Sequence, residues 1–229
     1  MHAGVRGSCL LALSVVLAAC SGGNTADAPS PASAPQAETN SAPEASPAFV
    51  SQAWGFRIDV PSGWTLRRDF QSGYLASGAW KAFAAPDSQG EPVLSLTVPG
   101  SNHITDAEIR IGASRDPVEV QRCTAPSSAV VAGSVATQRV NGIPFTTFEA
   151  ADAAMSHHLN VHALRVVHGG ACYAIDLMVY GVNPQVYDPP ATPPFADAHA
   201  FGAMRAVIQT FRFERSEGQP AAKASTAAR

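Results

Sequence analysis

The stretch "HALRVVHGGACYAIDLMVYG", residues 162–181, decides the fold of this chain. Two runs rich in β-branched and aromatic residues flank Gly169-Gly170, which is a strong signal for a two-residue hairpin turn. The second run is apolar except at Asp176. The stretch therefore predicts two long antiparallel strands joined by a tight turn.

The Gly-Gly turn also fixes which residues face each other across the hairpin. Position 165 faces 174 and position 163 faces 176, so Arg165 and Asp176 are diagonal neighbours on one face of the sheet. At that spacing the two side chains can form a salt bridge. We interpret them as a structural ion pair, with a catalytic carboxylate at Asp176 as the alternative.

A second hairpin precedes the first. "SVATQRV" and "IPFTTFEA", residues 134–140 and 143–150, flank Asn141-Gly142, the other strong two-residue turn signal. The two hairpins together predict an antiparallel meander. Alternation and turn residues predict further strands over residues 56–60, 80–86, 92–98 and 108–114, a strand that returns from Trp64, and a short last strand in 210–213.

Two helices are predicted beside these strands. Asp116-Pro117-Val118-Glu119 combines an N-cap, a proline at the first helical position and a glutamate three residues after the cap, which predicts a short helix to about Thr124. Phe201, Met204 and Ile208 mark the buried side of a closing helix, after a proline-rich loop over 181–195. The fold class expected is α+β, with an antiparallel sheet flanked by a middle helix and a C-terminal helix.

The cysteines of the chain number four. Cys123 falls on the inner face of the predicted short helix, and Cys172 on the face shared by Arg165 and Asp176. A helix packed over that face would bring the two sulfurs together. We therefore expect a disulfide between Cys123 and Cys172, with two separate buried thiols as the alternative.

Both ends of the predicted domain resemble a known family. "WGFRIDVPSGW", residues 54–64, and "VIQTFRF", residues 207–213, resemble the PsbP-like superfamily, whose members open with an aromatic-Gly-Phe strand running into Pro-x-Gly-Trp. The resemblance implies an α/β/α sandwich with an antiparallel sheet. It transfers no catalytic residue, because the superfamily has no shared one.

The N-terminal residues are typical of a targeting segment. An apolar run from Cys9 to Ala19 is too short to span a membrane, and Leu17-Ala18-Ala19-Cys20 resembles the bacterial lipobox. The resemblance implies a signal peptide over 1–19, cleavage before Cys20 and lipidation of Cys20. Ser21, in place of aspartate, favours the outer membrane by the usual sorting pattern. An ordinary secretory signal is the alternative.

Composition divides the rest of the chain. Residues 20–48 are dominated by alanine, serine and proline, which predicts a disordered spacer, and the tail 216–229 is similar. The globular domain is expected over 49–215. The formal charge of −3 and the lack of a basic stripe argue against nucleic acid as a partner.

Candidate chemistry centres on His157, His158, His162 and His168. Along a straight strand, His157 and His158 point to opposite faces, and His158 and His162 stand about 13 Å apart. Metal ligands must lie about 2 Å from one point, so these residues cannot chelate alone. We expect no metal and no cofactor, and interpret them as solvated sheet-face histidines.

No nucleophile motif, P-loop or Rossmann fingerprint is present in the sequence. The leading hypothesis is a non-enzymatic lipoprotein of the bacterial cell envelope, anchored through Cys20 and facing the periplasm, that binds or supports an envelope protein partner. One alternative is an envelope hydrolase with a site near the strand of His158 and His162. Another is a carrier of a small ligand or metal.

Overall fold

The computed structural model describes residues 47–214, and the predictions made for 1–46 and 215–229 lie outside the described residues. The larger of its two sheets is antiparallel, with seven strands in the order β3-β4-β5-β9-β8-β7-β6. In that order they are Thr65–Arg67, Glu91–Thr97, Thr105–Ser114, Ala171–Val182, His157–His168, Ile143–Ala154 and Ala136–Val140. The smaller antiparallel sheet has the order β1-β2-β10, formed by Ala48–Ser51, Phe56–Asp59 and Arg212–Phe213.

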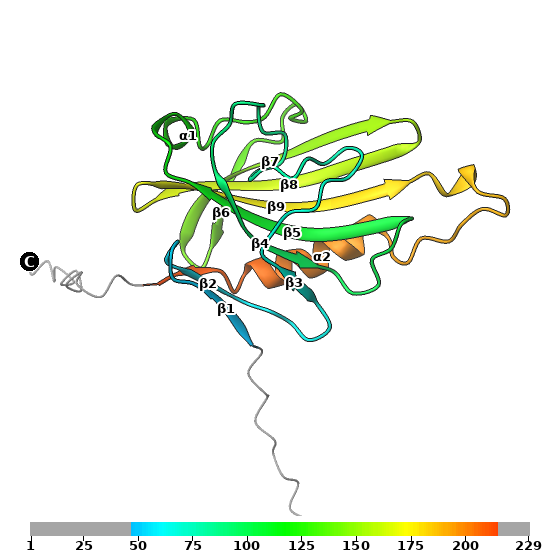
Figure 1. Ribbon diagram of the computed structural model, residues 1–229, viewed down its shortest axis with the longest axis horizontal. Helices are drawn as coiled ribbons and strands as arrows, with labels where there is room; N and C mark the ends of the chain where they lie inside the picture. Colours follow the sequence, from blue (N-terminus) through cyan, green and yellow to red (C-terminus); the bar gives the residue numbers. More distant parts are fainter. Residues whose placement is uncertain (1–46, 215–229) are drawn as a thin grey trace, which may run out of the picture. The chain divides into compact units, whose positions relative to one another are not determined.

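The two α-helices lie on opposite faces of the large sheet (Figure 1). Helix α1 (Pro117–Gln121) covers the face of Cys172 and Ala174, whereas α2 (Asp197–Ile208) covers the face of Ile175 and Leu177. A 3-10 turn, η1 (Pro184–Val186), lies in the loop between β9 and α2. The α+β class predicted from the sequence, with its two flanking helices, is therefore confirmed.

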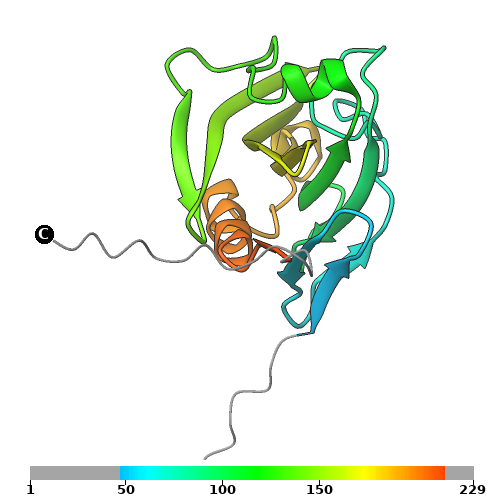
Figure 2. The same cartoon turned by 90° about the vertical axis from the view of Figure 1, so that its left-hand side faces the viewer.

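The main core lies on the α2 side of the large sheet. In Figure 2 the sheet curls around α2, with β6 and β7 in light green on one side and β4 and β5 in darker green on the other. Phe201, Met204 and Ile208 of α2 are buried against the sheet, as the helical spacing predicted. The aromatic rings of Phe56 and Phe211 join the small sheet to this core, with centroids 5.2 Å apart.

Both predicted hairpins form, and the hairpin at Gly169-Gly170 has the predicted register. Val140 pairs with Ile143 across Asn141-Gly142, and Ala163 pairs with Asp176 across Gly169-Gly170. The Nη2 atom of Arg165 lies 2.7 Å from the Oδ1 atom of Asp176, which confirms the ion pair expected on that face.

Helix α1 begins as predicted but ends earlier. The Asp116 side chain accepts hydrogen bonds from the backbone N–H groups of Val118 and Glu119. The helix ends at Gln121 rather than near Thr124, with Arg122 as its C-cap, and residues 122–124 continue as a turn that carries Cys123. The Sγ atoms of Cys123 and Cys172 lie 2.08 Å apart, with Cα atoms 5.4 Å apart, so the helix packs on the face of Cys172 that we expected.

The strand predicted over residues 80–86 is wrong. This segment crosses the face of the sheet instead of joining its edge, and the backbone of Trp80 packs directly on Gly112. The N–H of Ala82 donates to the Asp176 carboxylate at 2.8 Å. The apolar residues here are fixed by contacts across the sheet, so their alternation does not report a strand.

The strand returning from Trp64 also differs from the prediction. It exists as β3, but it pairs with β4 in the large sheet, whereas β2 pairs with β1 and β10 in the small one. The turn at Pro61-Ser62-Gly63 thus passes the chain from one sheet to the other. Turn residues alone do not distinguish this crossing from a hairpin.

Candidate functional site: a polar groove between β6 and α2

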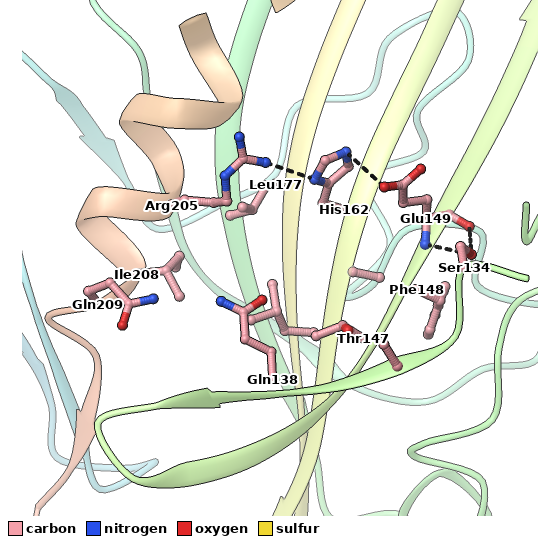
Figure 3. A pocket seen from close by; sticks show the side chains of 13 residues that line it. Ser134, Gln138, Thr147, Phe148, Glu149, His162, Leu177, Arg205, Ile208 and Gln209 are labelled. Carbon is pink, nitrogen blue, oxygen red and sulfur yellow. Dashed lines mark hydrogen bonds and ion pairs between the residues drawn. The ribbon is translucent and has the colours of Figure 1, made fainter. Parts of the chain in front are cut away.

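A groove with a volume of about 290 Å³ opens between the edge strand β6 and helix α2 (Figure 3). We call it the β6–α2 groove. It is lined by Ser134, Ala136, Gln138, Thr147, Phe148, Glu149, His162, Ala163, Leu164, Leu177, Arg205, Ile208 and Gln209. The apolar lining comes mainly from the sheet and Ile208, and the polar side chains of Glu149, His162 and Arg205 remain at least partly exposed to solvent.

The strand pairing places the polar groups side by side. Glu149 on β7 is the cross-strand partner of His162 on β8. The Nε2 atom of His162 lies 3.8 Å from Glu149 Oε1, and its Nδ1 atom lies 3.3 Å from the Arg205 guanidinium. Figure 3 shows the three side chains in a line, with the imidazole between the carboxylate and the guanidinium.

Helix α2 holds the His162 ring in place. The ring stacks on Phe201 with centroids 3.9 Å apart and planes 10° apart. Burial lowers the pKa of His162, and the positive charge of Arg205 lowers it further, whereas the negative charge of Glu149 opposes the shift. The lowered pKa favours the neutral imidazole, and because a guanidinium can only donate, the contact with Arg205 favours the tautomer in which Nδ1 accepts and Nε2 carries the proton.

Neither hydroxyl that lines the groove, that of Ser134 or that of Thr147, is hydrogen-bonded to His162. The Ser134 hydroxyl donates to the carbonyl of Val131 at 2.7 Å and accepts from the backbone N–H of Glu149 at 3.1 Å. The free lone pair of His162 faces a guanidinium rather than a hydroxyl. This arrangement suits recognition of a polar partner better than covalent chemistry.

The four candidate histidines do not form one site. His158 pairs with Asp197 at the start of α2, with Nε2 3.7 Å from Oδ2. His157 packs against Tyr74 on the opposite face, with the two ring planes tilted by 41°, and His168 stacks on Phe213. Within residues 47–214, no group of three or more histidine, cysteine, aspartate or glutamate side chains could hold a metal ion. Of the other candidate residues, Cys20 lies outside the described residues, and Cys123 and Cys172 lie on the other face of the sheet.

A second pocket, of about 410 Å³, lies on the opposite face near the loop 71–75. Two of the charged residues that line it, Glu108 and Arg110, are buried and form an ion pair. Arg110 donates to Glu108 at 2.7 Å and to the carbonyls of Ser77 and Gln71, and the Tyr180 hydroxyl donates to Glu108. Burial and the neighbouring Glu108 charge raise the pKa of Tyr180. This cluster fixes the loop to the sheet, so we do not assign it as the site.

Sequence reasoning identified His162 but missed Glu149 and Arg205. Glu149 could be placed opposite His162 only through the turn at Met155-Ser156, which sets the register of β7 against β8 and has no clear signal in the sequence. Both turn residues have positive φ, 47° and 68°, although neither is a residue type that favours this conformation. Arg205 could be placed only by knowing how α2 packs on the sheet.

Comparison with known proteins gives only distant similarities. No family model matches the chain, and no curated protein matches it. Among solved structures, it is similar to a Bacteroides thetaiotaomicron VPI-5482 protein at 13% identity and a TM-score of 0.41, covering 77% of this chain and 51% of that one. This chain therefore spans about half the length of the Bacteroides protein.

Two further structures are similar at lower identity. One is the cyanobacterial PsbP of Synechocystis sp. PCC 6803, with 9% identity, a TM-score of 0.39, and 74% of this chain and 94% of that chain covered. The other is LpqN of Mycobacterium tuberculosis, described as involved in cell envelope biogenesis, with 8% identity, a TM-score of 0.36, and 70% and 83% covered. Similarity at this level transfers neither an activity nor a ligand. Among residues 47–214, no helix is long and apolar enough to cross a membrane.

Proposed function

We propose that this protein is a lipid-anchored, non-enzymatic binding module of the bacterial cell envelope, and that the β6–α2 groove binds a segment of its partner. The observation that carries the proposal is the Glu149–His162–Arg205 line at the mouth of an open groove. These three side chains offer a partner a carboxylate acceptor, an imidazole ring and a guanidinium cation, and none of the three is a nucleophile of the serine or cysteine type.

The anchoring part of the proposal rests on the sequence. Leu17-Ala18-Ala19-Cys20 resembles a lipobox, and the Ala/Ser/Pro tract over 20–48 would hold the domain away from the lipid surface. More than one acyl chain gives stable attachment. Ser21 favours delivery to the outer membrane, on the periplasmic side.

Palmitate labelling in cells tests the anchor. The wild-type chain should incorporate labelled palmitate and lose residues 1–19. The Cys20→Ser variant should do neither and should accumulate as the precursor. A Cys20→Ser chain that is still labelled and still cut after Ala19 would exclude this residue as the lipid site.

Site-specific photo-crosslinking in the native host tests the groove. A photoreactive amino acid at position 138, on β6, should give discrete adducts that Arg205→Glu weakens. The same amino acid at position 185, on the exposed turn η1, serves as the matched control. Equal adducts from both positions, unaffected by Arg205→Glu, would argue against the groove as the binding site.

A hydrolase is the second candidate, because the groove does bring His162 together with a carboxylate. A general base would need its free nitrogen to face water or a nucleophile, and here that nitrogen faces Arg205. Release of nitrophenol from chromogenic esters that is abolished by His162→Gln would favour this alternative over binding.

A further inference from the structure

Strand β6 forms one free edge of the large sheet and also borders the β6–α2 groove. It pairs with β7 on one side only, and no other strand of residues 47–214 pairs with it. Its residues Ala136–Arg139 are all exposed. A free edge presents unpaired main-chain donors and acceptors to any extended chain beside it.

The hairpin register identifies which main-chain groups point outward. In a two-residue hairpin, the residues flanking the turn form a hydrogen-bonded pair, here Val140 and Ile143. The pairs then alternate, so Arg139 and Thr137 occupy the non-hydrogen-bonded positions. Pro144 stands opposite Arg139, and because proline has no N–H to donate, it fits a pair that forms no hydrogen bonds. The N–H and C=O groups of Thr137 and Arg139 therefore point away from β7, and none of the backbone hydrogen bonds that lie outside the helices and strand ladders of residues 47–214 uses them.

The opposite edge of the sheet is blunted, whereas β6 is not. Strand β3 is only three residues long, and Arg67 within it pairs with Asp69 at 3.1 Å. Short edges with charges along them resist strand pairing. On β6 the one charged side chain, Arg139, folds back on its own hairpin, with Nη1 2.8 Å from the Gly142 carbonyl.

Helix α2 forms the far wall of the space beside β6. Gln138 of β6 faces Ile208 of α2 and Gln209, the C-cap of that helix, across the groove (Figure 3). The Asn141 side chain donates to the carbonyls of Gln209 and Phe211, both at 2.8 Å, which ties the turn of the hairpin to the end of the helix. The groove is thus fixed at the end where the hairpin turn meets the helix. Because successive side chains of a strand point to opposite faces, every second side chain of a strand added to β6 would point toward the apolar lining of the groove.

The charges beside this edge favour an acidic occupant. The Arg205 guanidinium lies 3.3 Å from His162 Nδ1, and the Arg139 guanidinium donates to the Gly142 carbonyl, but neither arginine forms an ion pair with a carboxylate within residues 47–214. By contrast, Arg110 and Arg165 pair with buried carboxylates. Glu149 lies on the far side of the His162 ring from Arg205, so it leaves the guanidinium open to a ligand carboxylate (Figure 3).

We propose that β6 binds an extended, acidic segment of a partner protein by strand addition, with the outward main-chain groups of Thr137 and Arg139 pairing to it and Arg205 binding a carboxylate beside an apolar side chain. This inference rests on the proposed function and names the chemistry of its partner. Main-chain pairing supplies affinity in this mode, and alternate side chains supply specificity.

A palindromic peptide tests the proposal without presuming strand direction. The probe is fluorescent Thr-Glu-Thr-Val-Thr-Glu-Thr, and Thr-Lys-Thr-Val-Thr-Lys-Thr is its charge control. Fluorescence anisotropy should detect binding of the acidic peptide and not of the basic one. On binding, amide hydrogen exchange at Thr137 and Arg139 should slow, whereas Gln138, already paired to β7, should change little.

The Thr137→Pro variant removes one outward N–H without touching the ladder to β7, and should weaken binding at least about tenfold. Arg205→Glu should also weaken binding of the acidic peptide, because it replaces the guanidinium with a carboxylate that repels the glutamates of the peptide. Arg67→Glu, at the other edge, is the matched control and should bind as the wild type does. Circular dichroism and the thermal midpoint show whether Thr137→Pro folds, and the exchange experiment on the wild type tests the same pairing independently.

Three results would overturn strand addition by a partner. The first is that the acidic peptide does not bind, and the second is that the amides of Thr137 and Arg139 gain no protection from exchange. The third is that the chain dimerises through β6 and that Thr137→Pro abolishes the dimer, which would make a second copy of the chain the occupant. If crosslinks from position 138 depend on Arg205 while Thr137→Pro has no effect, the groove remains a binding site and only strand addition fails.

Discussion

Arg165 and Asp176 form a buried ion pair across the central hairpin, with Nη2 2.7 Å from Oδ1 and side chains 3% and 1% exposed. The contact is close in distance but is not aligned as a hydrogen bond. The second carboxylate oxygen accepts from the N–H of Ala82 at 2.8 Å, and the guanidinium donates to the carbonyls of Leu164 and Ile175. The pair therefore joins the segment that crosses the sheet to β8 and β9.

Removing one partner of this pair should destabilise the fold strongly. Asp176→Ala leaves the Arg165 charge buried and the Ala82 N–H unpaired, so we expect a loss of about 3–5 kcal/mol in the free energy of unfolding. Arg165→Met with Asp176→Leu removes both charges and should cost less than Asp176→Ala alone. Urea denaturation of the two variants measures the difference, and a double variant less stable than Asp176→Ala would contradict a penalty from the uncompensated charge.

The close approach of the Cys123 and Cys172 sulfur atoms predicts a disulfide bond. The bond would join two residues that are 49 positions apart in the sequence and so close a loop of that length. Thiol titration of the denatured, unreduced chain without residues 1–20 should find no free thiol. The chain-entropy treatment gives about 4 kcal/mol for such a loop, so Cys123→Ala with Cys172→Ala should lower the free energy of unfolding by roughly 2–4 kcal/mol. Two titratable thiols would contradict the bond.

The hairpins could be predicted from the sequence because their determinants are local. Asn141-Gly142 and Gly169-Gly170 fix the turn, and the apolar alternation fixes which face is buried. The Arg165–Asp176 pair follows from that register without any knowledge of the rest of the fold. Helix α2 follows in the same way from the spacing of its buried residues.

The remaining features depend on contacts between distant parts of the chain. Residues 80–86 alternate like a strand, yet Trp80 packs over Gly112 and Ala82 binds Asp176, and neither contact has a local signal. The β6–α2 groove requires the packing of α2 against β8, which brings Arg205 to His162 from 43 positions away in sequence. His162 alone could therefore be named in advance, but not its neighbours.

The stability of the domain should depend on the protonation of His162. Burial lowers the pKa of His162 in the folded state, with Arg205 adding to the shift and Glu149 opposing it. Because the unfolded chain takes up the proton more readily, the free energy of unfolding should be highest above the ordinary pKa of about 6.5 and fall as the pH drops from there toward the folded pKa. His162→Gln should flatten this part of the profile.

NMR titration of the imidazole resonances gives the pKa of His162 directly. Arg205→Gln should raise that pKa by removing the neighbouring positive charge, and Glu149→Gln should lower it by removing the negative one. A His162 that titrates at or above its ordinary value would contradict the buried, neutral ring. If the two variants shifted the pKa in the same direction, the placement of the ring between them would be wrong.

Gly112 and Gly202 offer a matched pair of glycine-to-alanine changes. A Cβ atom at Gly112 would lie 1.8 Å from the Trp80 carbonyl oxygen, which is backbone and cannot rotate away, whereas nothing lies within 4 Å of a Cβ at Gly202. Gly112→Ala should therefore lift the segment of Trp80 off β5 and lower the free energy of unfolding by about 1–3 kcal/mol or more. Gly202→Ala, on the exposed side of α2, should raise it by up to about 1 kcal/mol, since alanine favours the helix. Urea denaturation of both variants measures the two changes, and a Gly112→Ala chain as stable as the wild type would mean that Trp80 does not pack on β5.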